Sequence, residues 1–510
     1  MKHRILEFLR KYMLINSLTA SPQENDVLPF LSQYLQQFNY FRINIEHFGI
    51  HEIKGDPYER GIFWAMVKGA SDDTVILLHH SDVADTNDFA DFKAYAFDDQ
   101  KLQDILKNLD LSEEARADLE SGNYLFGHGA CDMKGGGAIQ MDALIKYSEQ
   151  PVRKGNLILL ALPDEESLSA GMREAADLLL MLKEKYNLRY KLVVNSEPHQ
   201  RKEPDKAVVS LGSSGKLLFF VYVQGVVSHL GKSDEGLSSL GIMSHLISRT
   251  DQSQRFTHVI KGERSPTPAW VFLRDVKERY DVSMPDGIFG CMNLLTFNNN
   301  LRYWVEQLEA VISEAVVEQQ KKLARNFPTK ILAFTPDLVN QPLKDKLESQ
   351  LKKGQLNYLE ATMELVKDYA SNARDHSPKI VYGLIPPFYP AVISDSVDLQ
   401  KLVDELKAYA RTKFNLELTQ EYFYTGLSDL SYTTNQTQSE DLRLIEEIMP
   451  FYGDSYKIPF EKLETLNIPS INLGPWGKDF HLRTERVLIE DLIRVFPNLL
   501  NHLIKQIFRE

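Results

Sequence analysis

Three strongly apolar segments near the N-terminus alternate with segments of helical periodicity, and this alternation most constrains the fold. The apolar segments are DTVILLHHSD (73–82), GNLILLALPDEE (155–166) and YKLVVNSEP (190–198), and the helical ones span 133–150 and 170–187. Strands that alternate with helices are typical of βαβ units. Continuous apolar strands indicate burial on both faces. We therefore expect an α/β fold with a mainly parallel central sheet flanked by helices.

The pattern changes near residue 208. A long aromatic strand (215–225) is followed by a helical segment at 301–323 and a polar helical segment at 337–374. The βα pattern resumes after residue 393. We therefore expect an inserted α+β domain that interrupts the α/β domain, which the family resemblance given below makes the catalytic domain. The expected boundaries are 1–207, 208–392 and 393–510.

Composition narrows the class of protein. The 510 residues are 43% hydrophobic, so a large core can form, and the net charge of −13 argues against a general nucleic-acid or anionic-membrane surface. The sequence contains no run of 18 or more apolar residues, so we expect no membrane span. Two cysteines favour a reducing compartment. The N-terminal segment has helical rather than signal-peptide character, which predicts a cytoplasmic protein. The acidic stretch 85–100 is expected to be a solvated loop.

Polar residues follow each of the three apolar strands. His80 and Asp82 end the first, the run Asp164–Glu166 ends the second, and Glu197 ends the third. Carboxyl ends of neighbouring parallel strands meet at one edge of a sheet, where ligands bind. A metal-binding imidazole usually donates its other ring N–H to a carboxylate, and His-x-Asp suits that arrangement. Each motif taken alone also fits an ordinary loop or helix start.

Two further motifs carry candidate ligands. Asp132 lies in FGHGACDMKGGG (126–137), between a glycine-rich turn and a helix, and His481 lies in GPWGKDFHLRTERV (474–487). The glycine-rich turn is not a P-loop, because no GK[ST] follows it. Two imidazoles and three carboxylates together suit zinc, or manganese or cobalt in its place. One carboxylate bridging two ions roughly 3.5–4 Å apart would make a two-metal hydrolase site.

The order of these motifs resembles a known family. The stretches YLFGHGACDMKGG, LPDEESLSAGMREA, VVNSEP and VYGLIPPFYP are similar to those of the co-catalytic zinc peptidase family. That family includes succinyl-diaminopimelate desuccinylase, peptidase T, aminoacylase and carboxypeptidase G2. Within it, the chain looks most like the branch of the arginine-utilization protein RocB. The resemblance implies the zinc-peptidase fold with an inserted lid or dimerisation domain.

The resemblance also implies roles for the motif residues. Two divalent cations, Zn²⁺ or else Mn²⁺ or Co²⁺, would be held by His80, Asp132, Glu166, Glu197 and His481. Asp132 would bridge the ions, with His80 and Glu197 on the first and Glu166 and His481 on the second. Asp82 would hold the ring of His80, and Glu165 would be the general base that deprotonates the attacking water.

A residue of the inserted domain has an implied role as well. In relatives, a histidine at the position of His229, in VQGVVSHLGKSDEG, steadies the tetrahedral oxyanion, often in the partner subunit. The residue also fits a surface turn. The family likeness implies a homodimer through the inserted domain.

The sequence departs from the family pattern at three places. His128 replaces the usual arginine in the glycine turn before Asp132. The usual motif for the substrate carboxylate is not evident, and Arg302 is only a weak candidate. The segment 337–374 enlarges the inserted domain. These departures leave the candidate metal site complete but bear on substrate and dimer geometry.

The function we expect is metal-dependent hydrolysis of an amide bond in a small peptide or an N-acyl amino acid, in arginine or amino-acid catabolism. A non-catalytic binding or sensing relative that keeps the fold and metal site is an alternative. A second alternative is a glycosidase that uses Glu165 with another acid. Such an enzyme needs two carboxyls at a set separation and no histidines. A Ser–His–Asp hydrolase is disfavoured, because no GxSxG elbow occurs.

Overall fold

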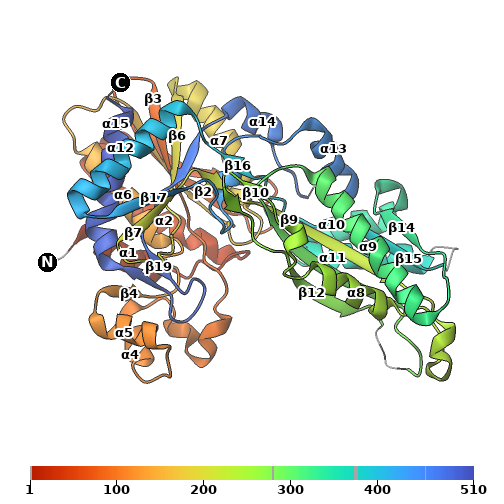
Figure 1. Cartoon of the computed structure of the whole chain (residues 1–510). Coiled ribbons are helices and arrows are strands. Elements are labelled where there is room, and N and C mark those ends of the chain that lie inside the picture. The colour runs from red at the N-terminus through yellow and green to blue at the C-terminus, as the bar shows by residue number, and fades with distance from the viewer. Residues whose placement is uncertain (1–2, 278, 280, 373–376, 454, 510) are drawn as a thin grey trace. The chain divides into compact units, whose positions relative to one another are not determined.

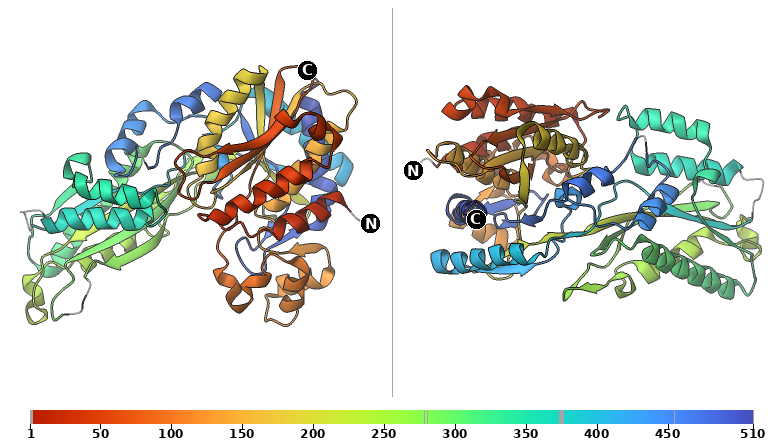
Figure 2. Two further views of the ribbon diagram at one scale, coloured as in Figure 1. Left: turned by 180° about the vertical axis from the view of Figure 1, so that it is seen from behind. Right: turned by 90° about the horizontal axis from the view of Figure 1, so that it is seen from above.

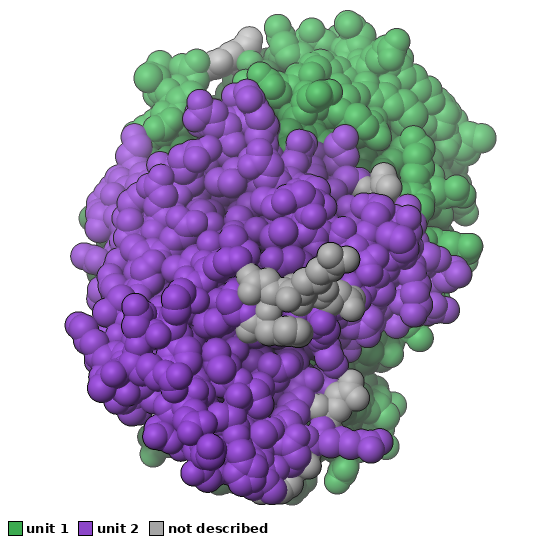
Figure 3. All heavy atoms as spheres, turned by 90° about the vertical axis from the view of Figure 1, so that its right-hand side faces the viewer, with its two compact units in different colours: residues 1–213, 392–435, 459–510 green, residues 214–391, 436–458 purple. Residues whose placement is uncertain are grey.

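The computed structural model describes residues 3–277, 279, 281–372, 377–453 and 455–509 (Figure 1). Two compact units form, coloured separately in Figure 3: unit 1 comprises Met1–Ser213, Val392–Asn435 and Pro459–Glu510, and unit 2 comprises Ser214–Ala391 and Gln436–Ile458. We expected residues 436–458 in the catalytic domain, whereas they belong to unit 2. The reason is that helix α13 (Ser439–Ile448) packs on helix α9 (Leu301–Leu323) and on strand β15 (Lys379–Leu384).

Unit 1 is built on an eight-stranded mixed sheet. In spatial order, its strands are β1 (Phe48–Glu52), β2 (Gly61–Val67), β5 (Asn156–Leu162), β3 (Asp73–His80), β6 (Arg189–Asn195), β18 (Ser470–Asn472), β7 (Lys206–Ser210) and β17 (Glu417–Glu421). Strands β5, β3, β6 and β18 run parallel, as do β7 and β17. The pairs β1–β2, β2–β5 and β18–β7 are antiparallel. The α/β fold expected from the sequence is confirmed, with antiparallel additions at both sides.

Helices surround this sheet. They are α1 (Arg4–Met13), α2 (Val27–Leu35), α3 (Asn39–Ile43), α6 (Lys134–Ser148), α7 (Ala170–Tyr186), α12 (Val397–Phe414), α14 (Phe460–Leu466) and α15 (Phe496–Ile507). Helices α1 and α15 come from opposite ends of the chain, yet both pack on α6 (Figure 2). They share one core with alternate strand residues such as Val75 and Leu77. The intervening Ile76 and Leu78 point to the other face and are buried as well. Burial on both faces explains why these strands are continuously apolar.

The glycine run at the start of α6 lets this helix lie directly against the sheet. A Cβ atom on Gly136 would stand 2.2 Å from the carbonyl oxygen of Ser196, and one on Gly137 would stand 2.6 Å from the ring of His79. Any side chain at either position would therefore clash with the ends of β6 and β3. The close approach places Asp132, just before the helix, next to the carboxyl ends of these strands.

A hairpin of β19 (Gly477–Lys478) and β20 (Arg486–Leu488) pairs with β4 (Tyr124–Phe126) in a small sheet. Helices α4 (Asp99–Leu106) and α5 (Glu113–Ser121) contact β4. The acidic stretch 85–100 is not simply a solvated loop. It forms the 3₁₀ segment η3 (Asn87–Tyr95), and the aromatic ring of Phe89 is fully buried in a core shared with Phe126 and Trp476. The expectation was wrong because it rested on the number of acidic residues, which does not show that aromatic side chains of the same segment are buried.

Unit 2 contains a five-stranded sheet in the order β12 (Ala269–Asp275), β13 (Gly287–Thr296), β9 (Gly215–Gln224), β15 and β14 (Lys330–Ala333). Helix α8 (Ser239–Thr250) contacts β9 and β13. Helices α10 (Gln341–Leu351) and α11 (Tyr358–Asn372) share a core with Phe220 and Phe289. They form most of the polar helical segment expected at 337–374, whose residues 373 and 374 lie outside the described residues. Among the described residues, no helix has the length and apolar content needed to cross a membrane.

Candidate metal centre

The candidate residues of unit 1 meet at the carboxyl ends of three adjacent strands. His80 ends β3, Glu165 and Glu166 follow β5, and Glu197 follows β6. Strand β3 pairs in parallel with both neighbours, so these ends lie side by side. The sheet order therefore brings together residues that are far apart in the sequence.

Asp132 lies between the two histidines. Its Oδ1 is 3.0 Å from Nε2 of His80, and its Oδ2 is 3.1 Å from Nε2 of His481. The carboxylate comes from the turn before α6, and His481 comes from the loop of the β19–β20 hairpin. Each carboxylate oxygen therefore faces a different imidazole, as a ligand shared by two ions would.

Each histidine is also close to a second carboxylate. Oε1 of Glu197 is 3.7 Å from Nε2 of His80, and Oε1 of Glu166 is 2.9 Å from Nε2 of His481. Ligand atoms of His80, Asp132 and Glu166 all lie within 4.8 Å of one another. The cluster thus divides into two halves that share Asp132: one with His80 and Glu197, and one with His481 and Glu166.

The electrostatics of the cluster indicate a deficit of positive charge. Burial raises the pKa values of Glu165 and Glu197 well above the ordinary range of a glutamate, and neighbouring carboxylates raise them further. Hydrogen bonds to Asp132 and Glu166 raise the pKa of His481 to about 11. Burial disfavours a charged His80, but Glu197 and Asp132 outweigh it and raise the pKa of this imidazole. Several buried carboxylates beside two imidazoles are a donor set that divalent cations fit.

Sequence analysis missed one further buried carboxylate near the cluster. Asp429 begins the 3₁₀ turn η7 (Asp429–Tyr432), and burial raises its pKa to about 7. Its charge contributes to the raised pKa of Glu165 and of Glu197. Asp429 therefore adds to the negative charge that a bound cation would offset.

Asp82 links two of the strand ends. The ring N–H at Nδ1 of His80 donates to the main-chain oxygen of Asp82 at 3.0 Å, which leaves Nε2 facing Asp132. The carboxylate of Asp82 is 3.5 Å from the same Nδ1 and accepts the main-chain N–H groups of Glu165 and Glu166, each at 3.2 Å. Asp82 thus orients the imidazole mainly through its carbonyl, and its side chain holds the turn that carries both glutamates.

The third acidic residue of that turn has a different role. Asp164 has a left-handed backbone (φ 72°), and its carboxylate binds Nη1 of Arg60 at 2.5 Å and the main-chain N–H of Ala170 at 3.0 Å. The same Nη1 lies 2.7 Å from Glu24, whose other oxygen accepts the N–H of Asp164 at 2.7 Å. Asp56 binds the rest of the guanidinium. This buried network fixes the turn and leaves Glu165 and Glu166 for the cluster.

Replacing Arg60 with leucine should destabilise unit 1 by about 3 kcal/mol, because three buried carboxylates would lose their shared cation. Denaturant unfolding of the variant beside wild type measures the loss. Arg42→Leu, at an exposed position, is the control and should change stability little. Equal stability of the Arg60 variant and wild type would contradict the assigned network.

The turn that carries Asp132 is held by a carboxylate that sequence reasoning missed. The carboxylate of Glu485 accepts main-chain N–H groups from Gly129 (3.1 Å), Cys131 (3.0 Å) and Asp132 (3.2 Å). It also lies 3.2 Å from Nδ1 of His128, the residue that replaces the usual arginine. Glu485 is only 1% exposed. Its position four residues after His481 was the available signal.

Two other candidates belong to unit 2. His229 caps the 3₁₀ segment η4 (Leu230–Glu235), with its exposed ring accepting the N–H of Gly231 at Nδ1 (3.1 Å). Arg302 lies in the first turn of α9, where its main-chain N–H donates to Asp441 at 3.0 Å. Their surroundings within unit 2 assign neither a catalytic role.

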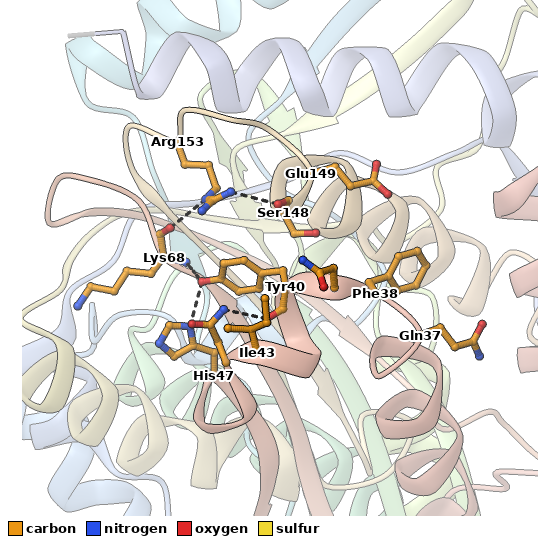
Figure 4. A pocket seen from close by; sticks show the side chains of 11 residues that line it. Gln37, Phe38, Tyr40, Ile43, His47, Lys68, Ser148, Glu149 and Arg153 are labelled. Atoms are coloured by element: carbon orange, nitrogen blue, oxygen red, sulfur yellow. Dashed lines mark hydrogen bonds between the residues drawn. The ribbon is translucent and has the colours of Figure 1, made fainter.

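A pocket of about 780 Å³ opens elsewhere on unit 1 (Figure 4). It is lined by Gln37, Phe38, Asn39, Tyr40, Ile43, Asn44, His47, Lys68, Ser148, Glu149 and Arg153. The hydroxyl of Tyr40 contacts Nδ1 of His47 at 2.9 Å, and the guanidinium of Arg153 donates to main-chain carbonyls. No residue of the cluster around Asp132 is among these lining residues, so the pocket is separate from the candidate metal centre.

Comparison with solved structures identifies the fold. A tripeptidase from Staphylococcus aureus aligns with a TM-score of 0.60 at 14% identity, covering 99% of this chain and 98% of that one. A dinuclear metal-binding peptidase, YXEP of Bacillus subtilis, aligns with a TM-score of 0.54 at 12% identity, with coverages of 99% and 98%. The fold is that of metal-dependent peptidases.

Sequence comparison then identifies the family. The chain belongs to Peptidase family M20/M25/M40, a family of metallopeptidases, whose model matches residues 104–464. It is 28% identical to YqjN of Bacillus subtilis (strain 168) over 541 residues, covering 100% of this chain and 97% of that protein. It is 26% identical to RocB of the same organism over 521 residues, with coverages of 95% and 92%. The resemblance inferred from the motifs, including that to RocB, is thereby confirmed.

Proposed function

We propose that this enzyme cleaves an amide bond of a small peptide or an N-acyl amino acid, with two divalent cations held by the cluster around Asp132. The observation that carries the proposal is the placement of the two Asp132 oxygens, each about 3 Å from a different imidazole. His80 and Glu197 would hold one ion, and His481 and Glu166 the other. Zinc suits this set of ligands best, with manganese or cobalt as substitutes.

The proposed chemistry follows from what the protein's own residues can do. When bound, divalent cations lower the pKa of a water molecule and polarise the scissile carbonyl. Glu165 is buried next to the cluster, and its main-chain N–H is fixed on Asp82. Its raised pKa suits a group that takes a proton from the attacking water and then delivers it to the leaving amine. No covalent enzyme intermediate is required.

Unit 2 would contribute oxyanion stabilisation and dimerisation. Because Nδ1 of His229 accepts a hydrogen bond, the neutral ring carries its proton on Nε2 and can donate it to a developing oxyanion. Strand β12 is at the edge of its sheet and exposes Val271 and Leu273. An exposed apolar edge strand favours pairing with a second chain, which supports a homodimer through this unit.

The biological setting is part of the proposal. Similarity to RocB over nearly the whole chain supports a place in amino-acid catabolism, with arginine-related compounds as the first substrates to test. The negative net charge and the two buried free cysteines suit a cytoplasmic enzyme that binds neither nucleic acid nor membranes.

Metal analysis tests the proposal directly. Wild type, reconstituted with zinc or manganese, should hold about two ions per chain, and Asp132→Ala should lose both, because it removes the shared ligand. Asp91→Ala, at an exposed carboxylate, is the control and should keep them. The loaded enzyme is then assayed with dipeptides, tripeptides and N-acyl amino acids. Failure of wild type to bind metal would refute the metal-dependent mechanism, and metal binding without turnover would favour a non-catalytic relative.

A further inference from the structure

His481 is the most exposed of the proposed ligands. Its side chain is 45% exposed, whereas those of Asp132 and Glu166 are each 12% exposed. It lies in the loop between β19 and β20 and has a left-handed backbone (φ 64°). The other ligands follow central strands or precede α6, so the place of His481 depends on what fixes this hairpin.

The hairpin has a repulsive pair at its base. Lys478 of β19 and Arg486 of β20 are direct partners in the antiparallel register. Like charges directly opposite each other destabilise a strand pair. Both side chains are largely buried, at 13% and 1% exposure, so water screens them poorly.

One carboxylate from α5 contacts both of these basic side chains. Oδ2 of Asp118 is 2.8 Å from Nζ of Lys478 and 2.7 Å from Nε of Arg486. Each basic side chain also has a carboxylate of its own: Lys478 lies 2.8 Å from Glu114 of α5, and Arg486 binds Asp479. Asp118 is the carboxylate that contacts both. At the loop, Asp88 of η3 accepts the main-chain N–H of Arg483 at 2.7 Å. The helical segment 85–121 thus holds both strands and the tip of the hairpin.

We propose that Asp118 is a positioning residue for the second metal ion, because it neutralises the Lys478–Arg486 pair and so keeps His481 beside Asp132 and Glu166. The proposal rests on the proposed function in that it assumes two bound ions. It assigns to the segment 85–121 the task of placing His481, a ligand of one half of the proposed metal centre. In the other half, His80 and Glu197 follow β3 and β6, so only the shared Asp132 depends on the hairpin, through Glu485.

The test is metal titration of the metal-stripped full-length chain, in competition with a chromophoric chelator. In Asp118→Asn, the affinity for one zinc equivalent should fall about tenfold or more, as for other residues that orient a metal ligand, while the other affinity falls clearly less, because His80 and Glu197 lie outside the hairpin. The site that is retained reports an intact fold. Glu120→Ala, an exposed acid on the same helix, is the control and should leave both affinities unchanged.

A second variant separates positioning from general destabilisation. Adding Lys478→Met to Asp118→Asn removes the repulsion between the opposed cations, so the lost affinity should largely return. A purely structural role for Asp118 would instead give further loss. If the single variant does not fold, the double variant still tests the proposal, since near wild-type affinity for both ions is expected from it. Two ions bound by Asp118→Asn as tightly as by wild type would overturn the proposal and leave the proposed function standing. No ions bound by wild type would instead refute the proposed function.

Discussion

Glu165→Gln is expected to lower kcat by a factor of about 10²–10⁴, while the metal content stays that of wild type. Glutamine keeps the size of the side chain and the main-chain N–H that binds Asp82, but it cannot accept a proton from water at neutral pH. Glu165 is within reach of the cluster, as its charge coupling to His80 and Glu197 indicates, yet it is not part of either proposed half-site. The variant should therefore separate proton transfer from metal binding.

The neighbouring residue supplies a matched control. Glu166→Gln alters a carboxylate 2.9 Å from His481, so it should weaken the binding of one ion as well as activity. Metal content and kcat are measured on both variants with the best substrate from the peptide and N-acyl panel. Full activity in Glu165→Gln, or the loss of metal from it, would exclude this residue as the general base.

Glu485→Ala is expected to cost about 5 kcal/mol of folding stability, because three main-chain N–H groups would lose their acceptor at about 1–3 kcal/mol each. Gly129, Cys131 and Asp132 all donate to this one buried carboxylate. A released turn would also move Asp132, the proposed ligand of both ions. Affinity for both ions should therefore fall about 10–100-fold.

Denaturant unfolding and metal titration measure the two effects in the same variant. Glu485→Gln, which keeps one accepting oxygen but loses the charge, should lie between alanine and wild type. Glu490→Ala removes an exposed carboxylate five residues away and is the control. If alanine at 485 left both the unfolding free energy and the metal affinity unchanged, the assigned hold on the Asp132 turn would be incorrect.

The sequence could predict that the central candidate residues lie together, because simple geometry brings them together. His80, Glu166 and Glu197 each follow an apolar strand, and parallel neighbours bring such ends together. Glu485 could not be found in this way, since its partners are main-chain amides more than 350 residues away. Asp118 shows the same limit, because its role depends on the register of a two-residue strand pair. Periodicity predicts helices and strands, but it does not predict which carboxylate will meet which loop.

The topology illustrates the same distinction. The parallel core strands were evident from their apolar runs, whereas β1 alternates exposed and half-buried residues and has only antiparallel pairing with β2. Residues 436–458 could not be assigned to unit 2 from their own pattern. An amphipathic helix such as α13 indicates that one face is buried, but not against which partner.

The glycine pair of α6 determines how well the proposed metal centre would tolerate substitutions in this helix. A Cβ atom on Gly136 would stand only 2.2 Å from the carbonyl oxygen of Ser196, so even one methyl group would push the helix outward by about 1 Å to reach ordinary contact distance. The two ions of a paired centre are roughly 3.5–4 Å apart, so such a shift is a large fraction of their separation. The lack of side chains at these two glycines would thus help to set the distance between the two ions, although α6 itself contributes no ligand.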